Sequence, residues 1–209
     1  MSDRHSPEDA DGATSESGAQ RGTVLYGHEQ DPTDNEYATR PEVWRPLSRA
    51  VDGFDVDPCS GAEPTPIAPT RYDRDDDGLA QKWHGAVWMN PPWSSTDGSA
   101  KETWLRKARN EAARDAVDVV VGILPVDASA TWFHEHVLRG ADAVCLCDRR
   151  YPFIGESRNP SFSLVVFAFG RVDAALLNAM DELGMVLVDG DRHDPMPQAT
   201  IPVVCADGE

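Results

Sequence analysis

Four consecutive residues, Asn90, Pro91, Pro92 and Trp93, carry groups that can act on a planar amine. They follow the apolar run 85–89, which predicts a buried strand that the two prolines end. Proline has no backbone N–H, so this turn offers carbonyl oxygens that remain free to accept hydrogen bonds. Because ligands of open α/β sheets bind beyond the carboxyl ends of strands, we interpret these four residues as a candidate catalytic corner.

The chemistry that suits this corner is transfer of a group to the amine of an aromatic base. Such an amine is a poor nucleophile because its lone pair is delocalised into the ring. The Asn90 side-chain oxygen and the Pro91 carbonyl would bind its two protons, favour a pyramidal nitrogen and direct the lone pair at a methyl donor. The Trp93 indole would stack on a base taken out of a duplex, which contributes about 1–3 kcal/mol. The alternative is that the corner only ends a strand.

Three further segments contain groups that suit a bound cofactor. Asp57 and Pro58 end a short predicted strand, where a carboxylate before a turn can bind an ammonium group or hydroxyls. Thr39, two residues after Tyr37, precedes the first predicted helix, whose free N–H groups and the threonine hydroxyl can receive a carboxylate. Asp77 can accept a hydrogen bond from an adenine amine. Taken singly, each segment has an ordinary explanation as an acidic turn, a helix cap or a solvated acidic run.

The elements that must position these groups alternate along the chain. Apolar runs and amphipathic segments predict an α/β fold with a doubly wound, mostly parallel sheet. The predicted strands are a short one at the start of 53–61, then 85–89, 117–125, 141–147, 161–170 and 184–190. The predicted helices are 41–51, 103–115, one that follows Ser129 and carries Trp132 to Val137, and 172–183. Pro46 is expected to kink the first helix or to move its start.

The domain organisation follows from composition. Residues 1–22 are acidic and poor in large apolar side chains, which predicts a disordered tail. We expect one domain over 23–190 and a C-terminal strand or tail over 191–209.

The charge of the chain is unusual. It carries a formal net charge of -17, with 36 acidic and 19 basic residues, and its only lysines are Lys82, Lys101 and Lys107. A plain acidic surface is one explanation, but the depletion of lysine favours adaptation to a high-salt cytoplasm. In molar salt, counterion release adds little to DNA affinity, so binding would depend on base contacts, stacking and a few arginines.

Several classes of protein are not expected. No apolar run approaches the ~20 residues of a membrane span, and the N-terminal residues lack the apolar centre of a secretory signal. The four cysteines are therefore expected as reduced thiols. Cys145 and Cys147 share a strand face but have no second pair at ligand spacing, so no metal is predicted.

A cluster of polar residues flanks the loop between two of the predicted strands. Arg149, Arg150, Arg158 and Asn159 lie there, and in so acidic a chain they indicate contacts with DNA phosphates. The alternative is pairing with acidic residues of the same loop.

The order of these motifs resembles the phage-type DNA N-6-adenine methyltransferase family over roughly residues 26–170. The resemblance is carried by Tyr37, Thr39, Pro41 and Glu42, by Asp57-Pro58-Cys59, by Asp77-Gly78-Leu79 with Trp83, and by Asn90-Pro91-Pro92-Trp93. Arg40 departs from the family, which usually has proline there.

The resemblance implies a Rossmann-like class I methyltransferase fold that uses S-adenosylmethionine. It implies that Thr39 and Asp57 contact the methionine end of the cofactor and that Asp77 contacts its adenine. Tyr37 and Pro58 are also expected at the cofactor. The interval between Asp57 and Asn90 is short, so the first half of the sheet is expected to be abbreviated. Asp73 is a candidate for the acid that binds the ribose.

We therefore expect site-specific methylation of the exocyclic amine of adenine in DNA, as in restriction-modification or phage defence, by a protein of cellular, viral or prophage origin. The residue types also fit a cytosine amine, an RNA adenine or a protein glutamine as acceptor. An inactive methyltransferase-like module that binds DNA remains a further alternative. Target recognition would come from loops such as 94–102 or from a partner.

Overall fold

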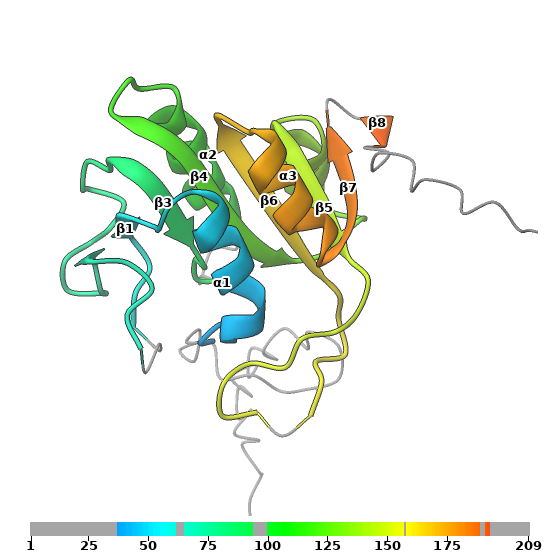
Figure 1. The fold of residues 1–209 in the computed structure, drawn as a ribbon. Coiled ribbons are helices and arrows are strands. Elements are labelled where there is room, and N and C mark those ends of the chain that lie inside the picture. Colours follow the sequence, from blue (N-terminus) through cyan, green and yellow to red (C-terminus); the bar gives the residue numbers. More distant parts are fainter. Residues whose placement is uncertain (1–36, 62–64, 94–99, 157, 189–190, 193–209) are drawn as a thin grey trace, which may run out of the picture.

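An eight-stranded sheet forms the centre of the computed structural model (Figure 1). The structure describes residues 37–61, 65–93, 100–156, 158–188 and 191–192. The strands are β1 Val56–Asp57, β2 Thr70–Arg71, β3 Gly85–Met89, β4 Val117–Pro125, β5 Ala143–Cys147, β6 Leu164–Gly170, β7 Gly184–Val188 and β8 Asp191–Arg192. The helices are α1 Pro41–Ala50, α2 Ala100–Ala112, α3 Ala174–Asp181 and the short π-helix η1 Phe133–Leu138.

The sheet is mixed, in the order β2-β1-β3-β4-β6-β5-β7-β8. All pairs from β2 to β4 are parallel, and all pairs from β4 to β8 are antiparallel. Because β6 lies antiparallel between β4 and β5, those two strands run in the same direction without pairing. The predicted α/β class is confirmed, whereas the sheet contains more antiparallel pairing than we expected.

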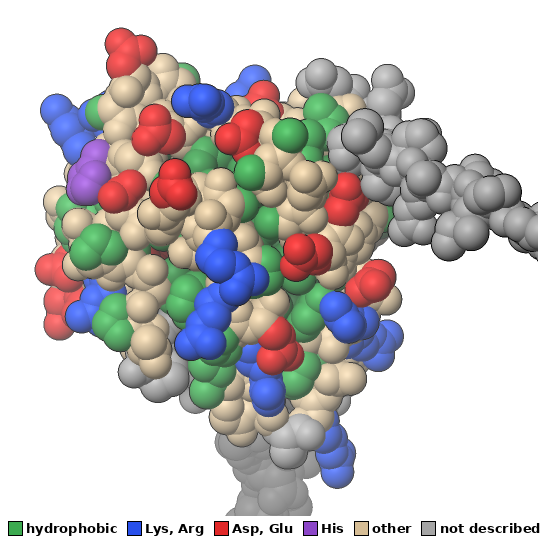
Figure 2. Space-filling model, viewed as in Figure 1, with side chains coloured by type: hydrophobic (Ala, Val, Ile, Leu, Met, Phe, Trp, Pro, Cys, Tyr) green, Lys and Arg blue, Asp and Glu red, His purple; other side chains and the backbone are tan. Residues whose placement is uncertain are grey.

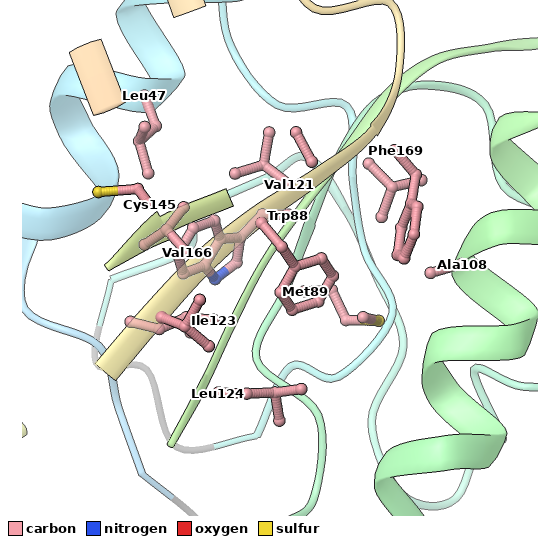
Figure 3. Packing of buried hydrophobic residues seen from close by; sticks show 14 of the residues in the cluster. Leu47, Trp88, Met89, Ala108, Val121, Ile123, Leu124, Cys145, Val166 and Phe169 are labelled. Atoms are coloured by element: carbon pink, nitrogen blue, oxygen red, sulfur yellow. The ribbon is translucent and has the colours of Figure 1, made fainter. Parts of the chain in front are cut away.

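Helices cover both faces of this sheet. α1 packs against α3, and α2 packs against η1. Figure 2 shows Asp and Glu side chains spread over the face that carries α1, as the net charge of -17 leads one to expect. Figure 3 shows Leu47 of α1 and Ala108 of α2 on opposite sides of the strands, with Trp88 and Met89 of β3 between them. All four of these side chains are fully buried.

The predicted strands and helices are found close to their expected positions. The continuous apolar run of β4 is buried from Val119 to Pro125, as expected for a strand covered on both faces. Its one glycine, Gly122, is required by packing, because an added β-carbon would lie 2.3 Å from the Phe167 ring. α2 begins at Ala100, three residues before the predicted helix.

The first helix contains two prolines. Pro41 occupies its first turn, where the missing N–H costs nothing. Pro46 lies inside the helix and does not move its start, so the helix continues although this residue donates no backbone hydrogen bond. Its buried residues Val43 and Leu47, one turn apart, fix it to the core.

The first half of the sheet is short, as predicted. β1 and β2 have two residues each, and the described residues between Asp57 and Gly85 contain no helix. The predicted N-terminal tail 1–22 lies outside the described residues, as does 193–209, while the first two residues of the predicted C-terminal segment form β8. Within the described ranges, no helix has the length and apolar character needed to cross a membrane.

Candidate active site

The carboxyl ends of β1, β3 and β4 meet at one edge of the sheet because these three strands are parallel. β1 ends at Asp57, and β3 ends at Met89, directly before Asn90. The predicted position of Asn90 to Trp93 directly after a strand is therefore confirmed. This edge is where open α/β sheets bind their ligands.

The Asn90 side chain is held by three hydrogen bonds. Its amide nitrogen donates to the Tyr37 carbonyl oxygen at 2.5 Å and lies 3.2 Å from the Thr39 hydroxyl. Its amide oxygen accepts a hydrogen bond from the Trp93 indole N–H at 3.2 Å. A carbonyl oxygen has two lone pairs, so this oxygen retains capacity for one more donor. Tyr37 and Thr39, expected at the cofactor, thus contact the corner itself.

Trp93 lies in a cluster of four aromatic rings. The Tyr37 ring stacks on the indole, with centroids 4.7 Å apart and planes 12° apart. Phe153 and Phe162 approach it edge-on at 5.2 and 5.4 Å. The sequence suggested that the indole face is open to a base. In the structure only 5% of Trp93 is exposed, and Tyr37 covers this face.

The residues before α1 also fasten a distant loop to the corner. The Arg40 guanidinium donates to the carbonyls of Pro152 at 2.9 Å and Glu156 at 3.3 Å. The Ile154 N–H donates to the Ala38 carbonyl at 2.9 Å. We call residues 37–40 the strap, since they join the corner to the segment that follows β5. The departure at Arg40 therefore has a structural role.

Two of the predicted cofactor segments lie against each other. The Asp57 carboxylate is 1% exposed and accepts a hydrogen bond from the Cys59 N–H at 3.1 Å. Gly78 packs on Pro58 so closely that an added β-carbon would lie 2.0 Å from the Pro58 carbonyl oxygen. Asp77, one residue earlier, is exposed and has a left-handed φ of 50°. The fold thus brings Asp57, Pro58 and Asp77 to the same region.

A buried ionic network holds the Asp77 segment in place. The Trp83 indole N–H donates to the Gly78 carbonyl at 3.0 Å, and the Trp83 backbone N–H donates to the Glu111 carboxylate at 3.0 Å. Lys107 at 2.8 Å and Arg114 also bond to this carboxylate. Burial raises the pKa of Glu111, but these three hydrogen bonds outweigh it and hold the pKa below its ordinary value.

Asp73 lies two residues after β2, at the same edge of the sheet as Asp57. It is exposed, and its Oδ1 accepts from the backbone N–H groups of Asp75 and Asp76 at 2.8 and 3.2 Å. These hydrogen bonds use Oδ1 of Asp73 to stabilise the turn. The position fits the proposed ribose-binding acid, although part of the carboxylate already stabilises the loop.

One family model matches a large part of the chain. The model described as DNA N-6-adenine-methyltransferase (Dam) matches residues 27–164, which is more than half of the chain. The chain belongs to the DNA N-6-adenine-methyltransferase family. No curated protein matches it. The matched range includes the strap, β1 to β5, the catalytic corner and the loop that carries Phe153.

The residues expected to contact DNA lie together on the loop after β5. Arg149, Arg150, Arg158 and Asn159 are all exposed. Arg149 donates to the Tyr151 hydroxyl at 2.9 Å and is 3.6 Å from the neighbouring aspartate, so it is paired within the loop. Pairing within the loop therefore applies to Arg149, whereas Arg150, Arg158 and Asn159 are exposed. Contact of these residues with DNA phosphates stays a prediction.

α1 carries two exposed basic residues that the sequence analysis did not single out. Arg45 and Arg49 are exposed and one helical turn apart, on the helix that begins directly after the strap. Figure 2 shows Lys and Arg side chains gathered over α1 and the loop after β5, among the acidic ones. In the sequence, Arg45 and Arg49 form an i, i+4 pair on the outward side of an amphipathic helix.

The sequence analysis also did not predict two sets of contacts that hold the site together. The Glu111 network was visible as Lys107 and Arg114 at i−4 and i+3, but nothing in the sequence revealed its bond to Trp83. The strap was assigned to a cofactor because its contacts with Asn90 span more than 50 residues of sequence. Among the described residues, no group of three His, Cys, Asp or Glu side chains can hold a metal ion.

Proposed function

We propose that this protein transfers a methyl group from S-adenosylmethionine to the exocyclic amine of adenine at specific sites in DNA. The observation that carries the proposal is the fixed amide of Asn90 at the carboxyl end of β3. Its oxygen has a second acceptor position that no described residue occupies. Membership of the DNA N-6-adenine-methyltransferase family supports the same reaction. The expected fold is the Rossmann-like class I fold, with which helices on both faces of the sheet agree.

The corner acts on the amine by accepting its protons. The Asn90 oxygen and the Pro91 carbonyl each bind one N–H, which localises the lone pair on nitrogen. Pro91 and Pro92 hold the backbone with fixed φ angles, so the acceptors need no rearrangement. Positioning is the main contribution, because the amine proton can leave after the new N–C bond forms.

The target base stacks on Trp93 in this proposal. Since Tyr37 covers the indole face, the base takes the position that the Tyr37 ring now holds, while the Tyr37 carbonyl remains bonded to Asn90. The exchange replaces one aromatic partner by another and so preserves stacking energy.

S-adenosylmethionine, when bound, supplies an electrophilic methyl group on its sulfonium. The residues present fit it: the buried Asp57 carboxylate suits the ammonium of the methionine end, and Pro58 and Gly78 form a close-packed wall beside it. Asp77 suits the adenine amine, and Asp73 after β2 suits the ribose hydroxyls. These assignments rest on the chemistry of the donor sets and on their shared edge of the sheet.

Exposed Arg150, Arg158 and Asn159, with Arg149 beside them, would contact phosphates on either side of the target. The low lysine content supports a high-salt cytoplasm as the setting, where few phosphate contacts would be effective. We propose a role in restriction-modification or phage defence only because such systems use site-specific methylation of adenine.

The deciding experiment incubates the full chain with S-adenosylmethionine labelled in its methyl group and with double-stranded DNA in molar KCl. Hydrolysis of the DNA and chromatography of its nucleosides should show label in N6-methyl-2′-deoxyadenosine. Asn90→Ala should abolish transfer but keep cofactor binding. Asn178→Ala, the same change on the exposed face of α3, is the control and should leave the rate unchanged.

Other products decide between the alternatives. Label in methylated cytosine of the DNA would replace adenine as the acceptor. In parallel reactions, label in added RNA or in protein glutamine would replace DNA as the substrate. An inert wild type that still binds DNA and the cofactor in high salt would favour the non-catalytic module instead.

A further inference from the structure

We propose that the strap and the Trp93 indole form a cradle that selects an amide at position 90, in which Thr39 is a positioning residue for Asn90 rather than a ligand of the cofactor. The proposal rests on the proposed function, because it concerns how Asn90 presents its oxygen to the target amine.

Two of the three groups around the amide can play only one role. The Tyr37 carbonyl can only accept, and it faces the Asn90 nitrogen at 2.5 Å. The Trp93 indole N–H can only donate, and it faces the Asn90 oxygen at 3.2 Å. A flipped amide would set acceptor against acceptor and donor against donor. The cradle therefore fixes which end of the amide is the oxygen.

Thr39 supplies the second acceptor for the amide nitrogen. Its hydroxyl lies 3.2 Å from the Asn90 nitrogen, and the residue is only 2% exposed. This hydroxyl lies against the half-buried Asn90 amide, which is the contact that a positioning role requires. Its place in the strap sets it beside Asn90, directly after the end of β3.

Donation from the amide nitrogen also strengthens the amide oxygen as an acceptor. When both N–H bonds donate, charge moves toward the oxygen, and such bonds reinforce each other in a site of low dielectric constant. The Asn90 oxygen that awaits the target amine is therefore more negative in the cradle than in a free side chain. The orientation and the acceptor strength of Asn90 thus have the same origin.

The variant Asn90→Asp separates this proposal from a simple need for an acceptor. A carboxylate keeps two oxygens for the amine, but it cannot donate to the Tyr37 carbonyl and would face it with negative charge. We expect kcat near pH 8 to fall about ten- to a hundredfold, the penalty of a buried unpaired acceptor. As the pH is lowered the carboxyl gains a proton and can donate, so activity relative to wild type should recover.

Thr39→Val and Thr39→Ser test the positioning role. The valine has nearly the same shape and no acceptor, so kcat should fall about three- to tenfold while the dissociation constant for S-adenosylmethionine stays unchanged. Serine should restore most of the rate. If Thr39 instead bound the cofactor, the valine variant would weaken cofactor binding and leave kcat unchanged at saturation, which would overturn the proposal.

A measurement without turnover keeps the proposal testable if the proposed function fails. The side-chain NH₂ pair of Asn90 can be assigned in an amide NMR spectrum by its loss in Asn90→Ala. In wild type it should exchange slowly with solvent, and in Thr39→Val faster. Equal exchange in both proteins, or an Asn90→Asp enzyme as active as wild type near pH 8, would refute the cradle even where adenine methylation is demonstrated.

Discussion

Replacing Gly78 by alanine tests whether the segment that contains Asp77 and Gly78 must contact Pro58. The β-carbon would lie 2.0 Å from the Pro58 carbonyl oxygen, and real β-carbons essentially never come closer than 3.0 Å to such an atom. The segments must therefore separate by about 1 Å, which is on the scale at which misplacement disturbs a site. The Gly78 carbonyl is tied to the Trp83 indole, so its segment cannot move away freely.

The cost follows from this geometry. Forcing one extra methyl group into a packed contact costs about 1–3 kcal/mol. In a chain of this size, that lowers the melting temperature by roughly 2–12 °C. If S-adenosylmethionine binds across Pro58 and Gly78, the same strain weakens its binding by about 5- to 150-fold, since 1.4 kcal/mol is tenfold.

The assay combines thermal unfolding with calorimetric titration of S-adenosylmethionine at a temperature where each protein is folded. Gly122→Ala is the control, because its β-carbon would meet the Phe167 ring at 2.3 Å in the sheet interior. Both variants should be less stable, but only Gly78→Ala should bind the cofactor more weakly. Normal cofactor binding by Gly78→Ala would refute the placement of the cofactor there, and an unchanged melting temperature would refute the contact itself.

Two further predictions concern the groups that hold the site together. Because the pKa of Glu111 is lowered in the folded protein, its stabilising effect is complete above the ordinary value of 4.5 and is lost as the pH falls below it. The free energy of unfolding of Glu111→Gln, measured with urea, should therefore lie about 1–3 kcal/mol below wild type at neutral pH and approach it in acid. Arg40→Gln removes the bonds to the Pro152 and Glu156 carbonyls, so KM for DNA should rise severalfold and proteolysis of that loop should quicken. Cofactor affinity should be unchanged, and an unaltered KM with unaltered proteolysis would contradict the role given to the strap.

Local patterns in the sequence were enough to predict most elements. The apolar runs of β3 and β4 and the prolines after Met89 located the corner at a strand end, because a strand buried on both faces has no polar alternation to obscure it. The shortened first half followed from the small number of residues available between Asp57 and Asn90.

Contacts between distant segments could not be predicted in the same way. The position of β6 between β4 and β5 depends on pairing across the whole sheet, and each of these strands is apolar enough to fit either place. The strap was expected at the cofactor, since a threonine before a helix binds anions as readily as it accepts from an amide. Nothing local reveals that Asn90 is its partner.

The stack of Tyr37 on Trp93 connects the strap to the way a base would enter. An aromatic pair contributes about 0.5–1.5 kcal/mol beyond its buried area, and a stacked base contributes about 1–3 kcal/mol. In the proposed exchange, an adenine that replaces the Tyr37 ring gives the indole a new stacking partner, so the indole is not left exposed to water. Because the Tyr37 carbonyl and not its ring holds Asn90, the ring can leave without releasing the amide. The same residue can thus protect Trp93 before the base arrives and keep Asn90 aligned after it has arrived.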